Sequence, residues 1–286
     1  MFFYHLLNRM APGQFWGTKL RFYRKMSYPL SLHNPKTFNE KINWRKAYDR
    51  NPLFPICADK LRVRDYVKDK IGEEHLIPLL YSGEQIDVDT LKGLEGEFVV
   101  KANHNSGRVH MVLADKPADL EAIAANINKQ LQRPYSTKTG EWWYAQIPPR
   151  ALIEKMLRSE SGEWAEDYKF FVFNRNGEKE VILQMTYGKE KDMNVVFYDE
   201  ALEPLPFKIH FNCDYRPFNK PKNYEKMVEL AKTLAGDLDF CRVDLYNVDG
   251  AIYFGEMTFA PTNGLAPFDP LKYDRWMGDK WQLPNR

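Results

Sequence analysis

The sequence predicts an α+β protein, because helix signals fill its first third and strand signals dominate its second half. Alternating apolar segments separated by turn residues begin at Asp167, after one strand–helix–strand pattern in the middle of the chain. Helices followed by runs of strands are typical of α+β folds. A chain of 286 residues with 44% hydrophobic content can bury a large core. We therefore expect a helical region and two sheet-containing units, with a ligand site between the two units.

The N-terminal region, residues 1–77, is predicted to be helical. Thr37-Phe-Asn-Glu40 has the spacing of a capping box and precedes KINWRKAYD, which indicates a helix. Asp59 is expected to cap a second helix from Lys60 to Lys70, with Gly72 just beyond its end.

A small α+β unit is predicted over residues 78–152. Phe98–Lys101 reads as a short buried strand, and 117–132 reads as a helix with Pro117 at its start. A further strand is expected from Arg150 to Leu157.

Residues 153–286 are predicted to form a larger sheet-based unit. YKFFVFN and EVILQMTY flank the turn NRNGE and indicate a hairpin, and NVVFYDE follows as a strand. A helix is expected from Asn223 to Leu234, where Gly236 stops it.

The segment from 242 to 258 is predicted to form a second hairpin. Asn247-Val-Asp-Gly250 fits a three-residue loop built on a type I turn, which sets Asn247 opposite Ala251 and Arg242 opposite Glu256. Because side chains alternate along strands, one face is expected to be polar and the other apolar. The polar face would carry Arg242, Asp244, Glu256 and Thr258, and the apolar face Cys241, Val243, Leu245, Tyr253 and Met257.

Two neighbouring carboxylates on that polar face, Asp244 and Glu256, predict a metal site. Such carboxylates raise each other's pKa unless a cation lies between them, and hard oxygen ligands suit Mg²⁺. The alternative is an exposed hairpin with an Arg242–Glu256 ion pair, and the residues alone leave both interpretations open.

Composition narrows the class of protein. A net charge of +2 argues against a protein that coats nucleic acid, and no stretch approaches the length of a membrane span or of a signal peptide. Cys57, Cys213 and Cys241 are widely spaced and odd in number, which is typical of a reduced cytoplasmic protein.

Charge is uneven along the chain, because residues 1–39 contain basic residues and no acid. This segment predicts peripheral contact with an anionic acceptor or with the inner face of a membrane. Basic residues that simply cap helices are the equally good alternative.

A phosphate-binding loop is expected after the strand that ends at Lys101. The loop Ala-Asn-His-Asn-Ser-Gly107-Arg108 follows, and Gly107 would permit close approach of the backbone to a phosphate. A solvated strand end is the alternative, since lysine is usually exposed.

Taken in order, these segments resemble the ATP-grasp ligases, and more narrowly their teichuronopeptide-biosynthesis, TupA-like branch. The resemblance covers about residues 27–286 and rests on five segments: KTFNEKINWRK, ICADKLRVRDYV, FVVKANHNSG, EDYKFFVFN and FCRVDLYNVDGAIYFGEMTF. It implies an ATP-grasp-like fold with a helical N-terminal region, a lid at 78–152 and a larger C-terminal subdomain.

The resemblance also implies roles for individual residues. Lys60 and Lys101 would hold the phosphates of ATP, Glu154 with the backbone of Lys155, Met156 and Leu157 would contact adenine, and Asp244 and Glu256 would hold Mg²⁺. Thr258 stands where the family has Asn, as a third candidate metal ligand.

Other residues near these positions remain open to two interpretations. Ser106 and the Asn side chains of the loop would replace backbone contacts to phosphate, because the loop has a single glycine. Arg108, with His104 and His110, could orient a substrate carboxylate, although a surface position is the expected one for each histidine. Lys169 would reach the nucleotide or substrate, or lie at a solvated strand edge.

Two further motifs are also open to simpler interpretations. Glu141-Trp-Trp-Tyr144 would stack on a sugar or fill a core, and the second is preferred. Asp87-Val-Asp89 and Asp237-Leu-Asp239 mimic the metal motif of glycosyltransferases but fall in connections.

The predicted function is ATP- and Mg²⁺-dependent ligation of a carboxylate to an amine through an acyl phosphate, with release of ADP. Lys101, Arg108 and Arg242 are the predicted catalytic residues. The resemblance implies attachment of an amino acid to a sugar carboxylate during surface-polysaccharide assembly, together with other assembly enzymes. The alternatives are a glycosyltransferase of the same pathway and a non-catalytic nucleotide-binding partner.

Overall fold

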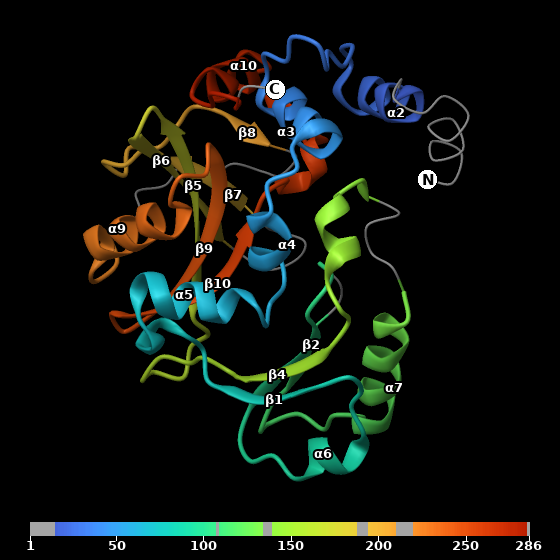
Figure 1. The fold of residues 1–286 in the computed structure, drawn as a ribbon. Coiled ribbons are helices and arrows are strands. Elements are labelled where there is room, and N and C mark those ends of the chain that lie inside the picture. Colours follow the sequence, from blue (N-terminus) through green and yellow to red (C-terminus); the bar gives the residue numbers. More distant parts are fainter. Residues whose placement is uncertain (1–14, 107–108, 134–138, 188–193, 210–219, 285–286) are drawn as a thin grey trace.

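The computed structural model describes residues 15–106, 109–133, 139–187, 194–209 and 220–284, and it confirms the predicted α+β class. A four-stranded antiparallel sheet has the order β1-β4-β2-β3, and a five-stranded antiparallel sheet has the order β10-β9-β5-β6-β7. Figure 1 shows the two sheets in separate layers, with α6 and α7 beside the smaller one. β8 and β11 form a short additional pair.

The N-terminal region is helical, as predicted, with α2 (Trp16–Met26), α3 (Phe38–Tyr48), α4 (Leu53–Cys57), α5 (Val63–Ile71) and the 3₁₀ turn η1 (Glu73–His75). The capping box is confirmed, because the Thr37 hydroxyl accepts from the Glu40 amide and the Glu40 carboxylate accepts from the Thr37 amide. The predicted start of α5 is wrong. The Asp59 carboxylate accepts from the amide of Leu61, which forms a tight turn, so Lys60 lies before the helix.

α3 packs into the larger unit, while its Trp44 joins a small separate cluster with Phe22 and Met26 of α2. Phe38 contacts Phe240 at a centroid distance of 5.2 Å, and Ile42 belongs to the same buried cluster. Arg45 is fully buried, donates to the Phe240 carbonyl at 2.8 Å and pairs with Asp239. The helical region therefore forms one wall of the larger unit.

The smaller unit contains β1 (Leu79–Gly83), α6 (Val88–Lys92), β2 (Phe98–Ala102), β3 (His110–Val112), α7 (Leu120–Leu131) and β4 (Ala151–Lys155). The turn η2 (Trp142–Gln146) precedes β4 in the chain but packs into the core of the larger unit. α7 begins at Leu120 after an Asp119 cap, so Pro117 lies ahead of the helix and does not start it. The predicted boundary at 152/153 cuts through β4, all of whose residues pair with β2, and the smaller sheet therefore runs to Lys155.

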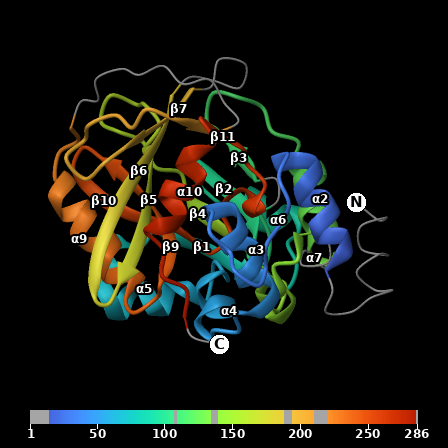
Figure 2. The same ribbon diagram turned by 90° about the horizontal axis from the view of Figure 1, so that it is seen from above.

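The larger unit contains β5 (Glu166–Arg175), β6 (Glu178–Tyr187), β7 (Asn194–Tyr198), β8 (Lys208–Ile209), α9 (Tyr224–Ala235), β9 (Phe240–Val248), β10 (Ala251–Thr258), η3 (Pro261–Gly264), β11 (Phe268–Asp269) and α10 (Lys272–Asp279). Figure 2 shows α9 on one face of the sheet and α3 and α10 on the other. Successive side chains of β5 point to opposite faces of the sheet. Phe170 packs against Tyr224 of α9, and Phe171 packs against Phe38 of α3.

The β9–β10 hairpin has a different register from the predicted one. Its turn is the two-residue Asp249-Gly250 loop, with φ of 54° and 100°, so Val248 pairs with Ala251. A bulge at Gly255 then adds one residue to β10 and sets Asp244 directly opposite Glu256 and Arg242 opposite Thr258.

The predicted polar face of the hairpin keeps its four members despite this shift. The apolar face changes, because the bulge reverses the alternation before Gly255 and places Phe254, not Tyr253, in the core. In the described part of the chain, no helix is long and apolar enough to cross a membrane.

Candidate functional site

A pocket of about 220 Å³ lies between the two sheets and is lined by all four residues predicted to contact adenine. Lys101, Glu154 and the segment 155–157 line one wall. Tyr246 of β9, with Trp164 and Ala165 just before β5, lines the opposite wall. A mixed polar and apolar pocket of this size suits a flat heterocycle held between two sheets.

Alternation along β2 and β4 decides which side chains reach this pocket. Phe98, Val100 and Ala102 are buried toward α7, so Val99 and Lys101 face the larger unit. β4 pairs Glu154 with Val99, which places the carboxylate on the same face.

Glu154 is buried and joined to two cations. Its carboxylate pairs with Lys101 Nζ at 2.5 Å and with Arg64 at 3.2 Å. Glu154 is therefore a paired, buried charge and does not lie at a solvated strand edge. Arg64 was not predicted for the site, and it reaches Glu154 from the first turn of α5.

Lys60 lies beside the loop that follows β2. Its ammonium donates to the Asn105 carbonyl at 2.5 Å, and the neighbouring Asp59 accepts from the Asn103 amide at 2.8 Å. Asn103 also bonds the backbone at Pro148 and Arg150, so it ties three segments together. Burial lowers the pKa of Lys60, and the nearby Glu256 carboxylate opposes that effect.

The Asn side chains of this loop were expected to contact phosphate, but they form hydrogen bonds within the protein instead. Asn103 is bonded as described, and Asn105 donates to Gln130 at 3.1 Å. His104 is buried and lies 3.2 Å from the Arg133 carbonyl, so the expectation of a surface position is wrong. Ser106 is exposed, whereas Gly107 and Arg108 lie outside the described residues.

Arg242 lies between the two carboxylates predicted to bind metal. It donates to both Asp244 oxygens at 2.7 Å and to Glu256 at 2.8 Å, and the Thr258 hydroxyl donates to Glu256 at 3.0 Å. Burial alone would lower the pKa of Arg242, but the two carboxylates outweigh it and raise that pKa. The Arg242–Glu256 pair thus exists, although not on an exposed hairpin.

Lys169 joins the same cluster from β5, opposite Asp244 in the sheet. Its ammonium pairs with Asp167 and lies 3.3 Å from Asp244, so a solvated edge is not its environment. Burial raises the pKa of Asp244 to about 6, against the opposing effect of Arg242 and Lys169. Three cations from different segments therefore lie near the pair Asp244 and Glu256, namely Lys60, Lys169 and Arg242.

The donor set fits a magnesium ion that also binds phosphate. The Asp244 side chain is buried, with 5% of its surface exposed, whereas 43% of the Glu256 side chain is exposed to solvent. Among the described residues no group of three or more His, Cys, Asp or Glu could hold a metal. Mg²⁺ commonly uses one or two carboxylates and takes its other ligands from water and substrate phosphates.

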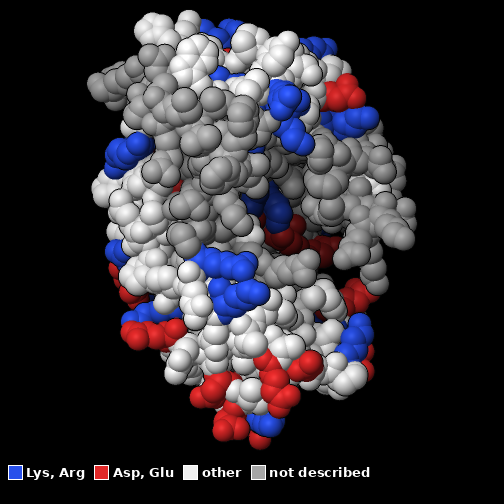
Figure 3. Space-filling view, turned by 90° about the vertical axis from the view of Figure 1, so that its right-hand side faces the viewer, with Lys and Arg blue, Asp and Glu red and all other residues white. Residues whose placement is uncertain are grey.

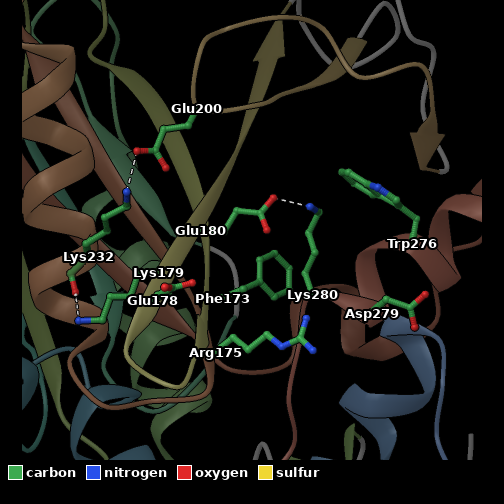
Figure 4. Close-up of a pocket in the computed structure, with 10 residues that line it drawn as sticks. All are labelled: Phe173, Arg175, Glu178, Lys179, Glu180, Glu200, Lys232, Trp276, Asp279 and Lys280. Atoms are coloured by element: carbon green, nitrogen blue, oxygen red, sulfur yellow. Dashed lines mark hydrogen bonds and ion pairs between the residues drawn. The ribbon is translucent and has the colours of Figure 1, made fainter.

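A larger pocket of about 630 Å³ lies apart from these residues, between β5, β6, α9 and α10 (Figure 4). Four of its charged groups form two pairs, since Lys232 lies 2.6 Å from Glu200 and Lys280 pairs with Glu180. None of the described residues predicted for the site lines it.

The remaining motifs have structural roles. Asp87 caps α6 through the Thr90 amide at 2.7 Å, and Asp239 accepts from the Trp281 ring at 2.6 Å, so neither Asp-x-Asp motif forms a metal site. Trp143 is buried and packs on Phe54 with centroids 5.5 Å apart, which confirms the preferred core interpretation.

Several residues that line the pocket between the sheets were not predicted from the sequence. Tyr246 could have been found, because it lies two residues after Asp244 and so shares its face of β9. Val109 and Met111 could not, since the short β3 carries no periodic signal.

Comparison with known proteins gives one family. The profile of the TupA-like ATP-grasp family matches residues 40–282. Among the curated proteins, none matches.

Solved structures give more distant similarities. A D-alanine–D-alanine ligase from Helicobacter pylori is 18% identical, with a TM-score of 0.44 over 80% of this chain and 62% of its own. An N5-carboxyaminoimidazole ribonucleotide synthetase from Thermus thermophilus is 12% identical, with a TM-score of 0.43 over 77% of this chain and 51% of its own. A RiPP-associated ATP-grasp ligase from Chryseobacterium gregarium, in complex with ADP and a leader and core peptide, is 14% identical, with a TM-score of 0.36 over 96% of this chain and 70% of its own. This chain therefore spans about three-fifths of the first of these proteins.

Proposed function

This chain belongs to the TupA-like ATP-grasp family, and on that premise we propose that it is an ATP- and Mg²⁺-dependent ligase that joins a carboxylate to an amine. The observation that carries the proposal is the continuity of the site. The adenine-sized pocket and the carboxylate pair are connected through Lys101, Glu154 and Lys60, whose charges influence one another.

The nucleotide would lie with its base in the pocket between the sheets. The backbone around Met156 and the ring of Tyr246 provide opposite walls for the base. Lys101, at the phosphate end of that pocket, would exchange its Glu154 partner for a phosphate oxygen, and Arg64 would continue to neutralise Glu154.

Phosphoryl transfer depends mainly on positioning and on neutralising charge. Lys60, Lys169 and Arg242 would stabilise the negative charge that develops as the γ-phosphate passes to the substrate carboxylate. The acyl phosphate then forms, and attack by the amine on its carbonyl carbon expels phosphate and leaves an amide.

Asp244 and Glu256, with Thr258 beside them, are the residues that would hold Mg²⁺. When bound, the ion would neutralise phosphate charge and align the transferring group. Glu256 would be the more adaptable ligand, because its side chain is open and it shares Arg242 with Asp244.

For the substrates, we infer a sugar carboxylate and an amino acid from the family, in the assembly of a surface polysaccharide. A cytoplasmic enzyme with peripheral contacts to the membrane or to assembly enzymes would fit the basic residues of α2, including Arg24 and Lys25. Residues 1–14 of the acid-free segment that motivates this contact lie outside the described residues.

The decisive experiment follows ATP cleavage with a panel of uronic acids, sugar-nucleotide uronates and amino acids. We expect ADP release that depends on the carboxylate, and hydroxylamine should replace the natural amine and yield a hydroxamate. A glycosyltransferase would give no hydroxamate, and a binding partner would give no substrate-dependent ADP. Release of AMP and pyrophosphate would contradict the acyl-phosphate mechanism.

A further inference from the structure

The chain between β4 and β5 folds into a small hairpin at the pocket between the sheets. Arg158 and Trp164 form an antiparallel bridge there. Inside that bridge, the Ser159 amide donates to the Glu163 carbonyl at 2.9 Å. We call residues 158–164 the strap. Its own hydrogen bonds order its backbone, although it belongs to no helix or longer strand.

Both units of the protein hold the strap. Arg158 donates to the two carboxylate oxygens of Glu97, directly before β2 in the smaller unit, with one of these bonds at 2.8 Å. The Glu160 amide donates to the Asp249 carboxylate at 2.8 Å, at the turn of the β9–β10 hairpin in the larger unit. Figure 1 shows the strap where the chain leaves β4, beside that turn. The strap therefore joins the two units beside the pocket.

Trp164 ends the strap and lines the pocket, yet 51% of this residue is exposed. The Arg158 guanidinium lies 5.9 Å from the centroid of the Trp164 ring. The arginine that binds Glu97 therefore also supports the indole. A large aromatic side chain that stays half exposed beside a pocket gains free energy when a flat ligand covers it.

Two other exposed apolar residues line the same pocket from the side of β3, namely Val109 and Met111. Single exposed apolar residues are ordinary, whereas several around one opening indicate a ligand site. The hollow on the face of α2 and α7 differs in character, because Figure 3 shows basic and acidic side chains inside it. The apolar opening beside Trp164 therefore suits a flat base and does not suit phosphate.

We propose that Trp164 is the stacking surface for the nucleobase, and that the strap positions its indole through the bonds to both units. The base would lie between Trp164 on one side and Val99 and Met111 on the other, all of which line the pocket. The inference rests on the proposed ATP-dependent function and adds to it the residue that supplies affinity for the base. Stacking of one base on an aromatic side chain is worth roughly tenfold in affinity.

The direct test measures the affinity of the full chain for ATP and for inorganic tripolyphosphate, each with Mg²⁺, by calorimetry. Tripolyphosphate carries the phosphates without the base, so only ATP reports on stacking. In Trp164→Ala, we expect ATP to bind at least about tenfold more weakly and tripolyphosphate to bind as in wild type. Trp164→Phe keeps an aromatic face and should bind ATP within about threefold of wild type. Unchanged ATP affinity in Trp164→Ala, or an equal loss for both ligands, would overturn the proposal.

Trp16→Ala is the matched control. Trp16 lies on α2, outside this pocket, and is exposed to a similar degree, 54%. Its replacement should change the affinity for neither ligand. A loss of ATP affinity as large as that of Trp164→Ala would show that removal of an exposed indole acts through general destabilisation.

Arg158→Gln tests the role of the strap, because it removes the paired bonds to Glu97 and leaves Trp164 in place. We expect weaker ATP binding with unchanged tripolyphosphate binding. The double variant Arg158→Gln/Trp164→Ala should lose no more ATP affinity than Trp164→Ala alone, because Arg158 acts through the indole. Additive losses would show that Arg158 does not position Trp164.

Hydroxamate formation separates this inference from the ligase proposal. A stacked base contributes equally before and during phosphoryl transfer, so Trp164→Ala should raise the KM for ATP at least about tenfold and keep kcat within about threefold of wild type. An unchanged KM, with hydroxamate still formed, would reject the stacking role and leave the ligase intact. Tryptophan-dependent ATP binding without hydroxamate from any carboxylate would support the stacking role and reject the ligase.

Discussion

The two acidic residues of the carboxylate pair differ in how tightly the protein holds them. Asp244 is buried, receives two bonds from Arg242 and lies beside Lys169, whereas Glu256 is open and receives one bond from Arg242. Charge-assisted hydrogen bonds in a buried site are worth about 1.5–3 kcal/mol each, and those at open sites are worth less. Asp244 therefore orients Arg242, and Glu256 can move toward an incoming cation.

Replacing either carboxylate should stop ligation but affect folding differently. We expect Asp244→Asn and Glu256→Gln each to lower turnover at least about a hundredfold, about 2.7 kcal/mol of transition-state stabilisation. Asp244→Asn should also cost about 1–3 kcal/mol of unfolding free energy, and Glu256→Gln under about 1 kcal/mol. ADP release at varied Mg²⁺ and urea unfolding measure the two effects.

Glu121→Gln on the exposed face of α7 is the matched control, and it should change neither quantity. Turnover within about tenfold of wild type in both site variants, at saturating Mg²⁺, would remove the metal assignment.

Lys46 gives a pH-dependent prediction about stability. Burial, together with repulsion from Arg21, lowers its pKa from 10.5 to about 7, and Glu141 opposes the shift. Between these values the unfolded chain binds more protons than the folded chain, so the contribution of Lys46 to stability rises with pH. The destabilising effect of a charged Lys46 is therefore full below about pH 7 and is absent above about pH 10.5.

The stability of Lys46→Met relative to wild type should thus fall as pH rises from about 7 to about 10.5, because the variant lacks the group that titrates. Urea unfolding of both proteins across this range measures the difference, in which other titrating groups cancel. A difference that does not change with pH would mean that Lys46 keeps its ordinary pKa in the folded protein.

At the scale of elements, the β9–β10 hairpin shows what the sequence could and could not predict. Both Asn247–Gly250 and Asp249-Gly250 contain the residues of a good turn, and the two choices differ by one residue in register. The bulge at Gly255 adds a second shift that composition does not reveal. Alternation nevertheless identified the polar face correctly, because Arg242, Asp244, Glu256 and Thr258 lie beyond the bulge on both strands.

Gly255→Ala should disturb the carboxylate pair without touching it. An added Cβ would lie 3.0 Å from the Asp244 carbonyl and 3.1 Å from the Tyr246 ring, which requires the bulge to move. Overpacking of this kind costs about 1–3 kcal/mol, and a shifted register would separate Asp244 from Glu256. We expect lower unfolding free energy and at least about tenfold lower ligation, about 1.4 kcal/mol.

Gly93→Ala at the end of α6 is the control, since its Cβ would meet the Asp89 and Thr90 carbonyls at 3.4 and 3.8 Å, which are ordinary contacts. If Gly255→Ala kept both stability and activity, the bulge would not be what aligns the two carboxylates.

At the scale of the whole molecule, the site depends on contacts that no local pattern contains. Lys60 reaches the β2 loop because Asn103 bonds Asp59, and Glu154 is neutralised by Arg64 from another helix. The order of segments was enough to assign Lys101 and Glu154 to one nucleotide site, and the pairing of β2 with β4 then sets them on one face. The burial of His104 was mispredicted because it depends on a tertiary contact with the Arg133 carbonyl. The start of α5 was mispredicted because the Asp59 carboxylate forms a local turn with the Leu61 amide instead of capping a helix.

The pocket between the two sheets leads to a prediction for the whole chain. One wall comes from β3, β4 and the segment 155–157, and the other comes from β9 and the chain before β5. A nucleotide held there contacts both units, so binding should suppress local opening in both. Hydrogen–deuterium exchange with and without ATPγS and Mg²⁺ measures this, and we expect slower exchange around Met156 and around Tyr246 at the same nucleotide concentration.

The pocket between β6 and α10, which includes Lys280, serves as the internal control, and its exchange should not change. Protection confined to the smaller unit would show that the nucleotide does not bridge the sheets, and the carboxylate pair on β9 and β10 would then be too far from the phosphates to act on them.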